Sequence, residues 1–370
     1  MNALPNSKTQ WPAAVGGGNI HTPAGVVVTG DLIDNGFTEY KRWLQFEKLF
    51  GLHGNGDGKL RYPVFEMRGN HDGANTTDYE QPPSVQGGNF VARGVVARTR
   101  TSDEPKTQLQ RLRRLKSTIQ RRLTSRGPLP PSPATFRLTA ISQSGLHYSW
   151  DWKNADGDVG AHMVALNLYV GDTCTGCAPY KCFYGPPCAA SWEYPEHSRT
   201  FLQKDLALYA KDPNTPVFVH QHYGMDGYSN LWYSEEQRIQ FHQALVGRAT
   251  LPLIFVGHTH AAQLYWWNGT HTGARADLTG EALPVANTPS TNKEPTQIFA
   301  VELRRDASSG ALVVRVALRT GDSWGDIAGN VTLSRGTDSN AVEDNWTSLD
   351  AAEVKSAGWH ARAHGESLKS

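Results

Sequence analysis

The sequence predicts an α/β protein organised around parallel strands, and three observations indicate this fold class. Short apolar runs alternate with segments of helical period, both near the start of the chain and between residues 198 and 256. The consecutive valines Val26–Val28 form the kind of β-branched run that parallel strands use when both of their faces are buried. Polar residues follow several of these runs directly. Alternation of strands and helices favours parallel pairing with right-handed crossovers.

The first β-α unit begins with Val26–Val28, which we expect to be a fully buried strand. Gly30 ends this strand and Asp31 follows at once, so a cation or a hydrogen-bonding partner is expected for the carboxylate. Aromatic residues at helical spacing predict a helix over Phe37–Phe50, and an apolar run predicts a second strand ending at Met67.

The later elements follow from the same patterns. An alternating run, a turn and a second run predict a β-hairpin, and two helical periods each lead into an apolar strand. These predicted elements are the hairpin Leu146–Trp152 and Ala161–Asn167, the helices Ser198–Ala210 and Glu235–Val246, the strands ending at Val219 and Val256, the strand and turn Gln263–Gly269, and the antiparallel pair Ile298–Leu303 and Ala311–Leu318.

Composition and charge exclude several classes of protein. The chain has 370 residues and 39% hydrophobic content, which is enough for a sizeable core. A net charge of +1 gives the protein no strong positive electrostatic potential that would attract nucleic acid, so a nucleic-acid partner is not expected. No apolar stretch approaches the roughly 18–20 residues that a membrane-spanning helix needs. The residues Met1–Pro5 show neither the basic start nor the apolar core of a signal peptide.

Metal-binding residue types follow four of the apolar runs. They are Asp31, the group Asn70, His71 and Asp72, the pair His220 and His222, and the pair His258 and His260. Residues two apart on an extended segment point to the same side, so each histidine pair is expected to face one way. Four strand ends of this composition are hard to explain by packing, and ligands bind at the carboxyl ends of strands in open α/β sheets.

The order of these motifs resembles the calcineurin-like metallophosphoesterase superfamily. The resemblance rests on Gly30–Asp34 as G-D-x-x-D, Gly69–Asp72 as G-N-H-D, the histidines after the third run, and Gly257–His260 as G-H-x-H. It implies a four-layer αββα sandwich, with two mixed sheets flanked by helices, in a single domain over residues 1–335. It also implies hydrolysis of a phosphoester at two divalent metal ions, Mn, Fe or Zn, with a metal-activated water.

The resemblance also implies metal ligands. Asp31 bridges the two ions, because a carboxylate has two oxygens, and Asn70 and His258 hold one ion while His260 holds the other. The remaining ligand is His220 or His222. Its place at the strand end favours His220, whereas the Tyr223–Gly224 turn favours His222, toward which we lean.

The same motif implies two catalytic residues that do not bind metal. His71 is expected to donate a proton to the leaving alcohol, and Asp72 to hold the imidazole ring in the right tautomer.

The chain departs from the superfamily in one motif. The leading D-x-H is absent, since no Asp precedes Asp31 and the only earlier His is His21. We therefore expect the first strand of the fold to be lacking through N-terminal truncation, with weak or absent turnover. The alternative is a catalytically impaired metal-binding scaffold. A nuclease is a third hypothesis, which overall charge disfavours.

Three segments depart from the compact pattern. Residues 98–126 predict a basic amphipathic helix. This helix either packs on the domain through its leucines or forms a flap whose arginines attract anionic substrate toward the site. The four cysteines, Cys174, Cys177, Cys182 and Cys188, form a Cys-rich excursion at residues 174–188. We favour disulfides or structural thiols there over a zinc knot, because a second C-x-x-C is missing. A secreted or periplasmic location is slightly favoured over a cytoplasmic one. Residues 336–370 predict a polar tail, and the oligomeric state stays open.

Overall fold

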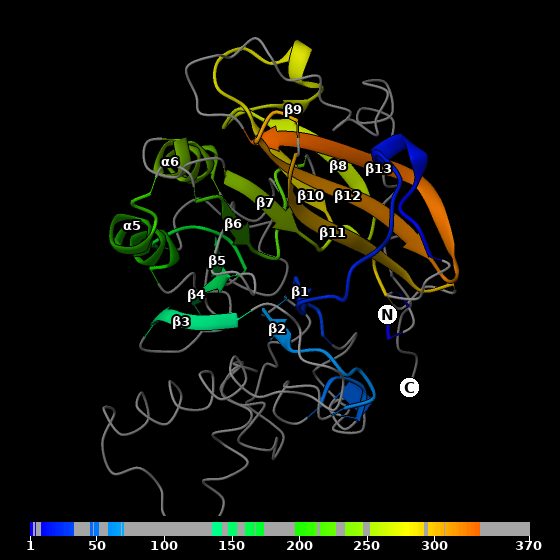
Figure 1. The fold of residues 1–370 in the computed structure, drawn as a ribbon. Coiled ribbons are helices and arrows are strands. Elements are labelled where there is room, and N and C mark those ends of the chain that lie inside the picture. Colours follow the sequence, from blue (N-terminus) through cyan, green and yellow to red (C-terminus); the bar gives the residue numbers. More distant parts are fainter. Residues whose placement is uncertain are drawn as a thin grey trace, which may run out of the picture.

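The computed structural model describes residues 1–2, 4, 9–32, 45–46, 48–51, 58–67, 69, 135–142, 147–153, 160–166, 168–173, 197–212, 215–226, 234–246, 252–291, 295–306 and 308–333. Within this part of the chain the fold is α/β, with one large mixed sheet and few helices (Figure 1). The predicted fold class is therefore confirmed at this level.

The large sheet has eight strands and a parallel centre. Its spatial order is β3 (Thr135–Ile141), β4 (Tyr148–Lys153), β5 (Ala161–Ala165), β6 (Val217–His220), β7 (Pro252–Val256), β10 (Leu283–Asn287), β8 (Gln263–Trp267) and β9 (Thr272–Gly273). Strands β5, β6, β7 and β10 run parallel, while β3, β4, β8 and β9 are joined by antiparallel pairing. Parallel pairing brings the carboxyl ends of β6, β7 and β10 to one edge.

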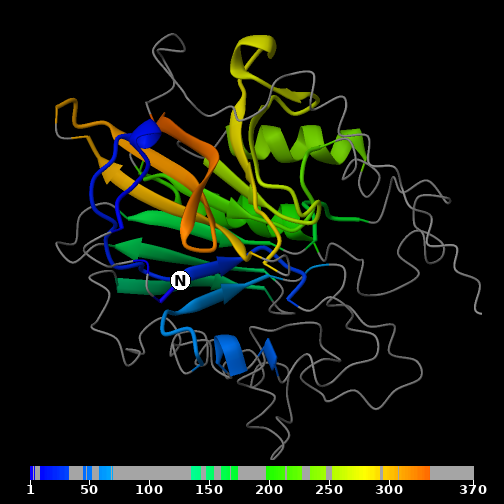
Figure 2. The same ribbon diagram turned by 90° about the vertical axis from the view of Figure 1, so that its right-hand side faces the viewer.

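Two helices cover one face of this sheet. Figures 1 and 2 show α5 (Ser198–Tyr209) and α6 (Glu235–Val246) together on that face. Their buried side chains Leu202 and Phe241 join a core cluster with Val219 and Ile254 of the central strands. Short 3-10 helices occur at Ala13–Val15 and Arg275–Asp277.

A second layer of strands covers the opposite face. It contains the antiparallel strands β11 (Gln297–Arg305), β12 (Leu312–Thr320) and β13 (Ser323–Leu333), and the parallel pair β1 (Val26–Val28) and β2 (Val64–Glu66). Val314 and Val316 pack with Phe255 of the large sheet, and the ring of Phe65 stacks on Trp150 at 4.4 Å.

The described layers are thus helix, sheet and sheet, and a four-layer sandwich is not confirmed. Helical residues also occur at 45–46 and 48–50. Phe50 among them packs near Val26 and Val28. This is the described part of the helix predicted over Phe37–Phe50.

The prediction that Val26–Val28 is fully buried was wrong. All three residues of β1 have intermediate exposure, whereas all three residues of β2 are buried. Among the described strands β1 pairs only with β2, and its other edge borders a cavity. A strand with a neighbour on one edge alone cannot bury both of its sides.

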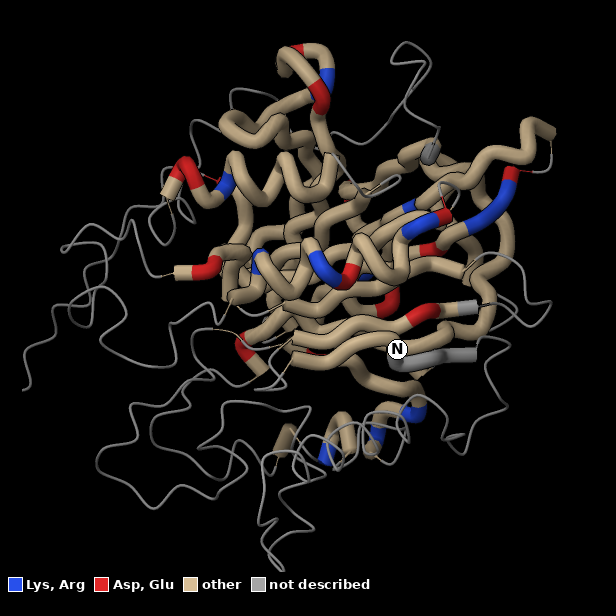
Figure 3. The backbone as a smooth tube through the Cα atoms, turned by 90° about the vertical axis from the view of Figure 1, so that its left-hand side faces the viewer, with Lys and Arg blue, Asp and Glu red and all other residues tan. Residues whose placement is uncertain are grey.

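Charged positions are spread over the described chain. On the side drawn in Figure 3, basic and acidic residues are interspersed along the described backbone. Among the helices that the structure describes, none is long and apolar enough to span a membrane. The predicted basic helix at 98–126, the Cys-rich excursion at 174–188 and the polar tail at 336–370 lie outside the described residues.

A buried ionic cluster joins α5 to the large sheet. His162 of β5 places Nε2 at 2.7 Å from Asp205 of α5 and Nδ1 at 3.0 Å from Asp151 of β4. The hydroxyl of Ser149 donates to the other Asp205 oxygen at 2.6 Å. Burial lowers the pKa of His162, but hydrogen bonds and ion pairs with the two aspartates outweigh it and raise the pKa to about 9.

Arg315 of β12 ties the N-terminal segment to the second layer. Its side chain donates to the Gly17 carbonyl at 2.6 Å and to Glu302 at 2.6 Å, and the guanidinium lies 4.3 Å from the centre of the Trp11 ring. The buried guanidinium thus joins residues about 300 positions apart in the chain.

Replacing Arg315 with methionine is expected to lower the free energy of unfolding by roughly 1.5–3 kcal/mol, because buried hydrogen bonds to a charged group are lost. Urea denaturation measures this change. Arg319→Met is the matched control, because Arg319 is on the same strand as Arg315 and lies over the ring of Trp324 in β13 at the greater distance of 5.2 Å. Equal losses in both variants would contradict an anchoring role for Arg315.

Candidate metal site

Three predicted ligands meet where β1, β6 and β7 end. Asp31 follows β1, His222 follows β6 and His258 follows β7. One metal-binding atom from each residue lies within 4.8 Å of the other two. The structure therefore brings together side chains from three separate segments and from both sheet layers.

The distances within this group suit a single divalent cation. His222 Nε2 lies 3.3 Å from Asp31 Oδ2 and 3.2 Å from His258 Nδ1. Ligand atoms at roughly 2.1 Å from a tetrahedral metal lie about 3.4 Å from one another. Oxygen and nitrogen donors of this kind suit Zn²⁺ and similar transition metals.

A backbone carbonyl orients His222 for this role. His222 Nδ1 lies 2.8 Å from the carbonyl oxygen of Thr29, which can only accept, so the ring nitrogen donates. In the neutral ring this bond leaves the lone pair on Nε2, the atom that faces Asp31 and His258. Metal-binding histidines commonly have their second nitrogen held in this way.

The backbone is strained at the predicted ligands. Four non-glycine residues of the described chain have positive φ, and three of them are Asp31 at 50°, His258 at 73° and His260 at 60°. Such conformations cost about 1–3 kcal/mol each, and they cluster at functional sites where the surrounding structure enforces them.

Two glycines allow the loops to approach. A Cβ on Gly30 would lie 2.6 Å from His222 Nδ1, and a Cβ on Gly69 would overlap the backbone nitrogen of Asp31. Side chains at either position would therefore push the Asp31 loop away from its neighbours. The predicted residues Asn70, His71 and Asp72 follow Gly69 but lie outside the described residues.

Replacing Gly69 with alanine is expected to weaken divalent metal binding at least about 10-fold, because the added methyl displaces Asp31 from the other two ligands. Isothermal titration of the metal-free protein with Zn²⁺ measures the affinity. The control is Gly273→Ala, where the nearest atom to an added Cβ lies 4.0 Å away. Unchanged affinity in the Gly69 variant would show that the close approach of Gly69 to Asp31 does not determine metal binding.

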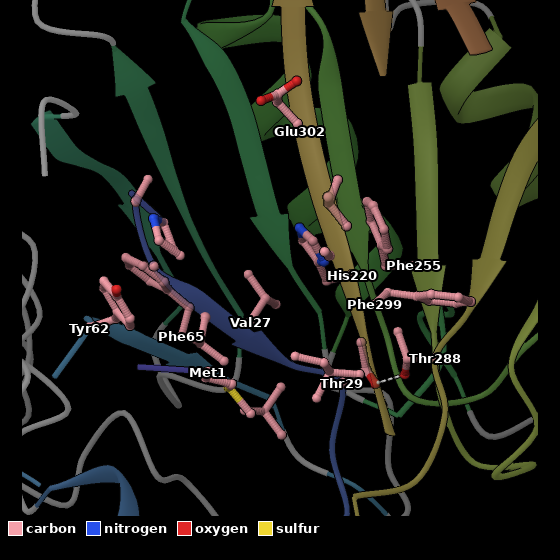
Figure 4. Close-up of a pocket in the computed structure, with 18 of the residues that line it drawn as sticks. Met1, Val27, Thr29, Tyr62, Phe65, His220, Phe255, Thr288, Phe299 and Glu302 are labelled. Carbon is pink, nitrogen blue, oxygen red and sulfur yellow. Dashed lines mark hydrogen bonds between the residues drawn. The ribbon is translucent and has the colours of Figure 1, made fainter. Parts of the chain in front are cut away.

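Two residues at the carboxyl end of β10 support the site, the last residue of the strand and the one that follows it, and sequence reasoning missed both. The hydroxyl of Thr288 lies 2.6 Å from that of Thr29 and donates to the Val256 carbonyl at 2.9 Å (Figure 4). Asn287 donates to the Ala261 carbonyl at 2.8 Å and to the hydroxyl of Thr259. The carboxyl end of β10 thus contacts both the loop before Asp31 and the loop that bears His258.

The other two described candidates lie outside the group of three. His220, on β6 itself, stacks on Phe255 at 5.1 Å, and its burial lowers its pKa to about 3, so its ring is neutral. This geometry favours His222 over His220 as the ligand. His260 is half-buried and borders the same cavity as His220, but it is not among the atoms gathered within 4.8 Å.

Comparisons with known proteins do not identify a family for this chain. No protein-family model matches the chain, and no curated protein matches it. The chain is similar to a solved structure of PhoD, with a TM-score of 0.40 and 10% sequence identity. The similarity covers 88% of this chain and 66% of that chain, so this chain spans a little less than two thirds of its length.

Proposed function

We propose that this protein is a metal-dependent phosphoric ester hydrolase. The observation that supports this most strongly is the convergence of Asp31, His222 and His258, whose ligand atoms lie within 4.8 Å of one another. These residues belong to the motifs that resemble the calcineurin-like metallophosphoesterases. The sequence order and the geometry therefore point to the same residues.

The residues of the site have different proposed roles. Asp31, His222 and His258 would hold a divalent cation, which would supply Lewis-acid chemistry for polarising a phosphoryl oxygen and activating a water. His222 and His258 are neutral donors, and Thr29 holds the ring of His222. The carboxylate of Asp31 brings one negative charge to the site and has two oxygens, which suits it to serve two ions.

We extend the proposal to a second ion held by His260, with Asn70 as a further ligand on the first. Mn, Fe or Zn would suit these oxygen and nitrogen donors. His71 is proposed to donate a proton to the leaving alcohol, with Asp72 orienting its ring. A phosphoester is the proposed substrate.

The test is hydrolysis of p-nitrophenyl phosphate and of bis(p-nitrophenyl) phosphate by the metal-stripped chain, with and without Mn²⁺. Because the leading D-x-H is absent, we expect weak turnover that requires the metal and that falls at least about 100-fold in Asp31→Asn. His271→Gln, in the exposed turn between β8 and β9, is the control. Metal binding without any turnover would overturn the hydrolase proposal and leave a metal-binding scaffold. Full turnover in Asp31→Asn would overturn the assignment of the site.

A further inference from the structure

The loop that carries His258 and His260 crosses the end of another strand. It joins β7, which ends at Val256, to β8, which begins at Gln263, and β10 lies between these two strands in the large sheet (Figure 1). β10 is parallel to β7 and antiparallel to β8, so the end of β7, the start of β8 and the carboxyl end of β10 share one edge. The connecting loop therefore passes over Asn287, the last residue of β10.

This loop has an unfavourable backbone conformation. His258 has a φ of 73° and His260 a φ of 60°, both in the left-handed region. Such a conformation is costly for a residue with a side chain, and it persists only when the surrounding structure enforces it. Gly257 donates to the His222 carbonyl at 2.9 Å, which fixes the start of the loop. Both strained histidines come after this contact, so a further contact is needed to hold them.

The side chain of Asn287 supplies that contact. Its Nδ2 donates to the Ala261 carbonyl at 2.8 Å and to the hydroxyl of Thr259. A carbonyl oxygen can only accept, so the amide nitrogen is the atom that faces Ala261. Thr259 lies between the two histidines and Ala261 follows the second. A single amide group therefore holds the loop on both sides of His260.

Burial and the two amide hydrogens suit Asn287 to this role. The residue is 0% exposed, and it is paired with Val256 of β7 and with Gln263 of β8. Hydrogen bonds shielded from water are electrostatically stronger than those at the surface. The asparagine amide has two N–H groups, one for each of the two acceptors in the loop. An aliphatic side chain of similar size would release the loop at both points.

We propose that Asn287 is a positioning residue for the metal site. Its amide holds the loop so that Nδ1 of His258 lies 3.2 Å from Nε2 of His222, within the group of ligands that also contains Asp31. Asn287 acts through the loop, because its Nδ2 is committed to Thr259 and Ala261. The inference rests on the metal site of the proposed function, and it does not require hydrolysis.

The test compares Asn287→Leu with Asn268→Leu in the full chain. Asn268 is the matched control, because its Nδ2 also donates to a backbone carbonyl, that of Thr279 at 3.1 Å, beyond the opposite end of β8. Hydrogen–deuterium exchange over residues 257–262 is measured without metal, and isothermal titration measures Zn²⁺ affinity. In Asn287→Leu we expect exchange to be at least about 10-fold faster and Zn²⁺ binding at least about 10-fold weaker. The control should show neither change.

A second variant tests whether Asn287 acts through the loop. Thr259→Val removes an acceptor hydroxyl from a half-buried position and keeps Asn287 in place. We expect Zn²⁺ binding about 3-fold weaker in this variant, because one hydrogen bond is lost. The double variant should bind at most about 2-fold more weakly than Asn287→Leu alone, because both changes remove the same contact. The visible absorption of bound Co²⁺ should shift in Asn287→Leu and in Thr259→Val, since it reports ligand geometry.

The outcomes separate this inference from the proposed function. Unchanged exchange or unchanged Zn²⁺ affinity in Asn287→Leu would overturn the positioning role alone, as would losses that multiply in the double variant. If Asn287→Leu does not fold, Thr259→Val decides, and an unchanged affinity and Co²⁺ spectrum in that variant would overturn the role. Absence of Zn²⁺ binding by the unaltered chain would overturn the metal site and the proposed function together with this inference.

Discussion

Replacing His222 with glutamine is expected to weaken divalent metal binding by more than about 100-fold, a larger loss than removing an outer hydrogen-bond partner causes. His222 is the central member of the site, because its Nε2 lies 3.3 Å from Asp31 and 3.2 Å from His258. Its Nδ1 also contacts the Thr29 carbonyl at 2.8 Å. The two nitrogens of the imidazole ring face opposite ways, one donating to Thr29 and the other directed at the metal site. A glutamine amide cannot place a donor and a metal-binding atom in these two positions at once.

Isothermal titration with Zn²⁺ and with Mn²⁺ measures the affinity, and circular dichroism checks that the variant is folded. His271→Gln removes an exposed imidazole elsewhere and is expected to bind both metals as the unaltered chain does. A His222 variant that retains affinity within a factor of about three would show that this ring is not a ligand.

Replacing His162 with leucine is expected to lower the free energy of unfolding by about 3–5 kcal/mol, because it leaves Asp151 and Asp205 without their shared cation. Asp205 is 2% exposed, so its carboxylate cannot recover much hydration. The effect should exceed that of a surface substitution such as His271→Gln. Urea denaturation at pH 6 gives both values.

The same cluster predicts how stability depends on pH. The pKa of His162 is raised to about 9 from the ordinary value of 6.5, so the folded state holds this proton more tightly than the unfolded chain. Its contribution is fully present below pH 6.5 and is lost as pH rises through about 9. A shift of this size corresponds to about 3 kcal/mol.

The free energy of unfolding of the unaltered chain should therefore fall between pH 6.5 and 9.5, whereas that of His162→Leu should fall much less. If the free energy of unfolding fell equally with pH in the two proteins, a charged His162 in the folded state would be contradicted. The control His271→Gln should follow the unaltered chain, because His271 takes no part in the cluster.

Several elements were predictable because local pattern and tertiary role agree in them. The helices predicted over Ser198–Ala210 and Glu235–Val246 match α5 and α6. The strands predicted to end at Val219 and Val256 match β6, which continues one residue further to His220, and β7. Each contributes apolar side chains to the central core, such as Leu202 of α5, Phe241 of α6, Val219 of β6 and Ile254 of β7. The antiparallel pair that closes the chain was also found, as β11 and β12.

Other strands carried no adequate local signal. β10 has a proline inside the strand and ends on an asparagine, and β13 contains two glycines and an aspartate, residues that strands avoid. Their pairing with β7 and β12 places them in the sheets, so neighbours distant in sequence decide the outcome. The exposure of Val26–Val28 was missed for the same reason, since a strand's own sequence does not show whether both of its edges are paired.

The candidate site was partly predictable from residue types at strand ends. Asp31 and His258 were identified there, and the choice between His220 and His222 needed the structure, because both share the same two-residue spacing. Thr29, Asn287 and Thr288 were missed, because they act through hydrogen bonds with residues far along the chain. The Thr29 carbonyl accepts from His222, and Asn287 donates to the Ala261 carbonyl. Thr29 and Thr288, for example, are 259 residues apart.

The most direct test of the central claim is anomalous scattering from crystals of the chain grown with Zn²⁺. We predict a peak at roughly 2.0–2.3 Å from Asp31 Oδ2, His222 Nε2 and His258 Nδ1 together. A second peak beside His260 would support the proposed pair of ions. Well-ordered Asp31, His222 and His258 side chains without any peak between them, at a Zn²⁺ concentration that saturates binding in solution, would contradict the account.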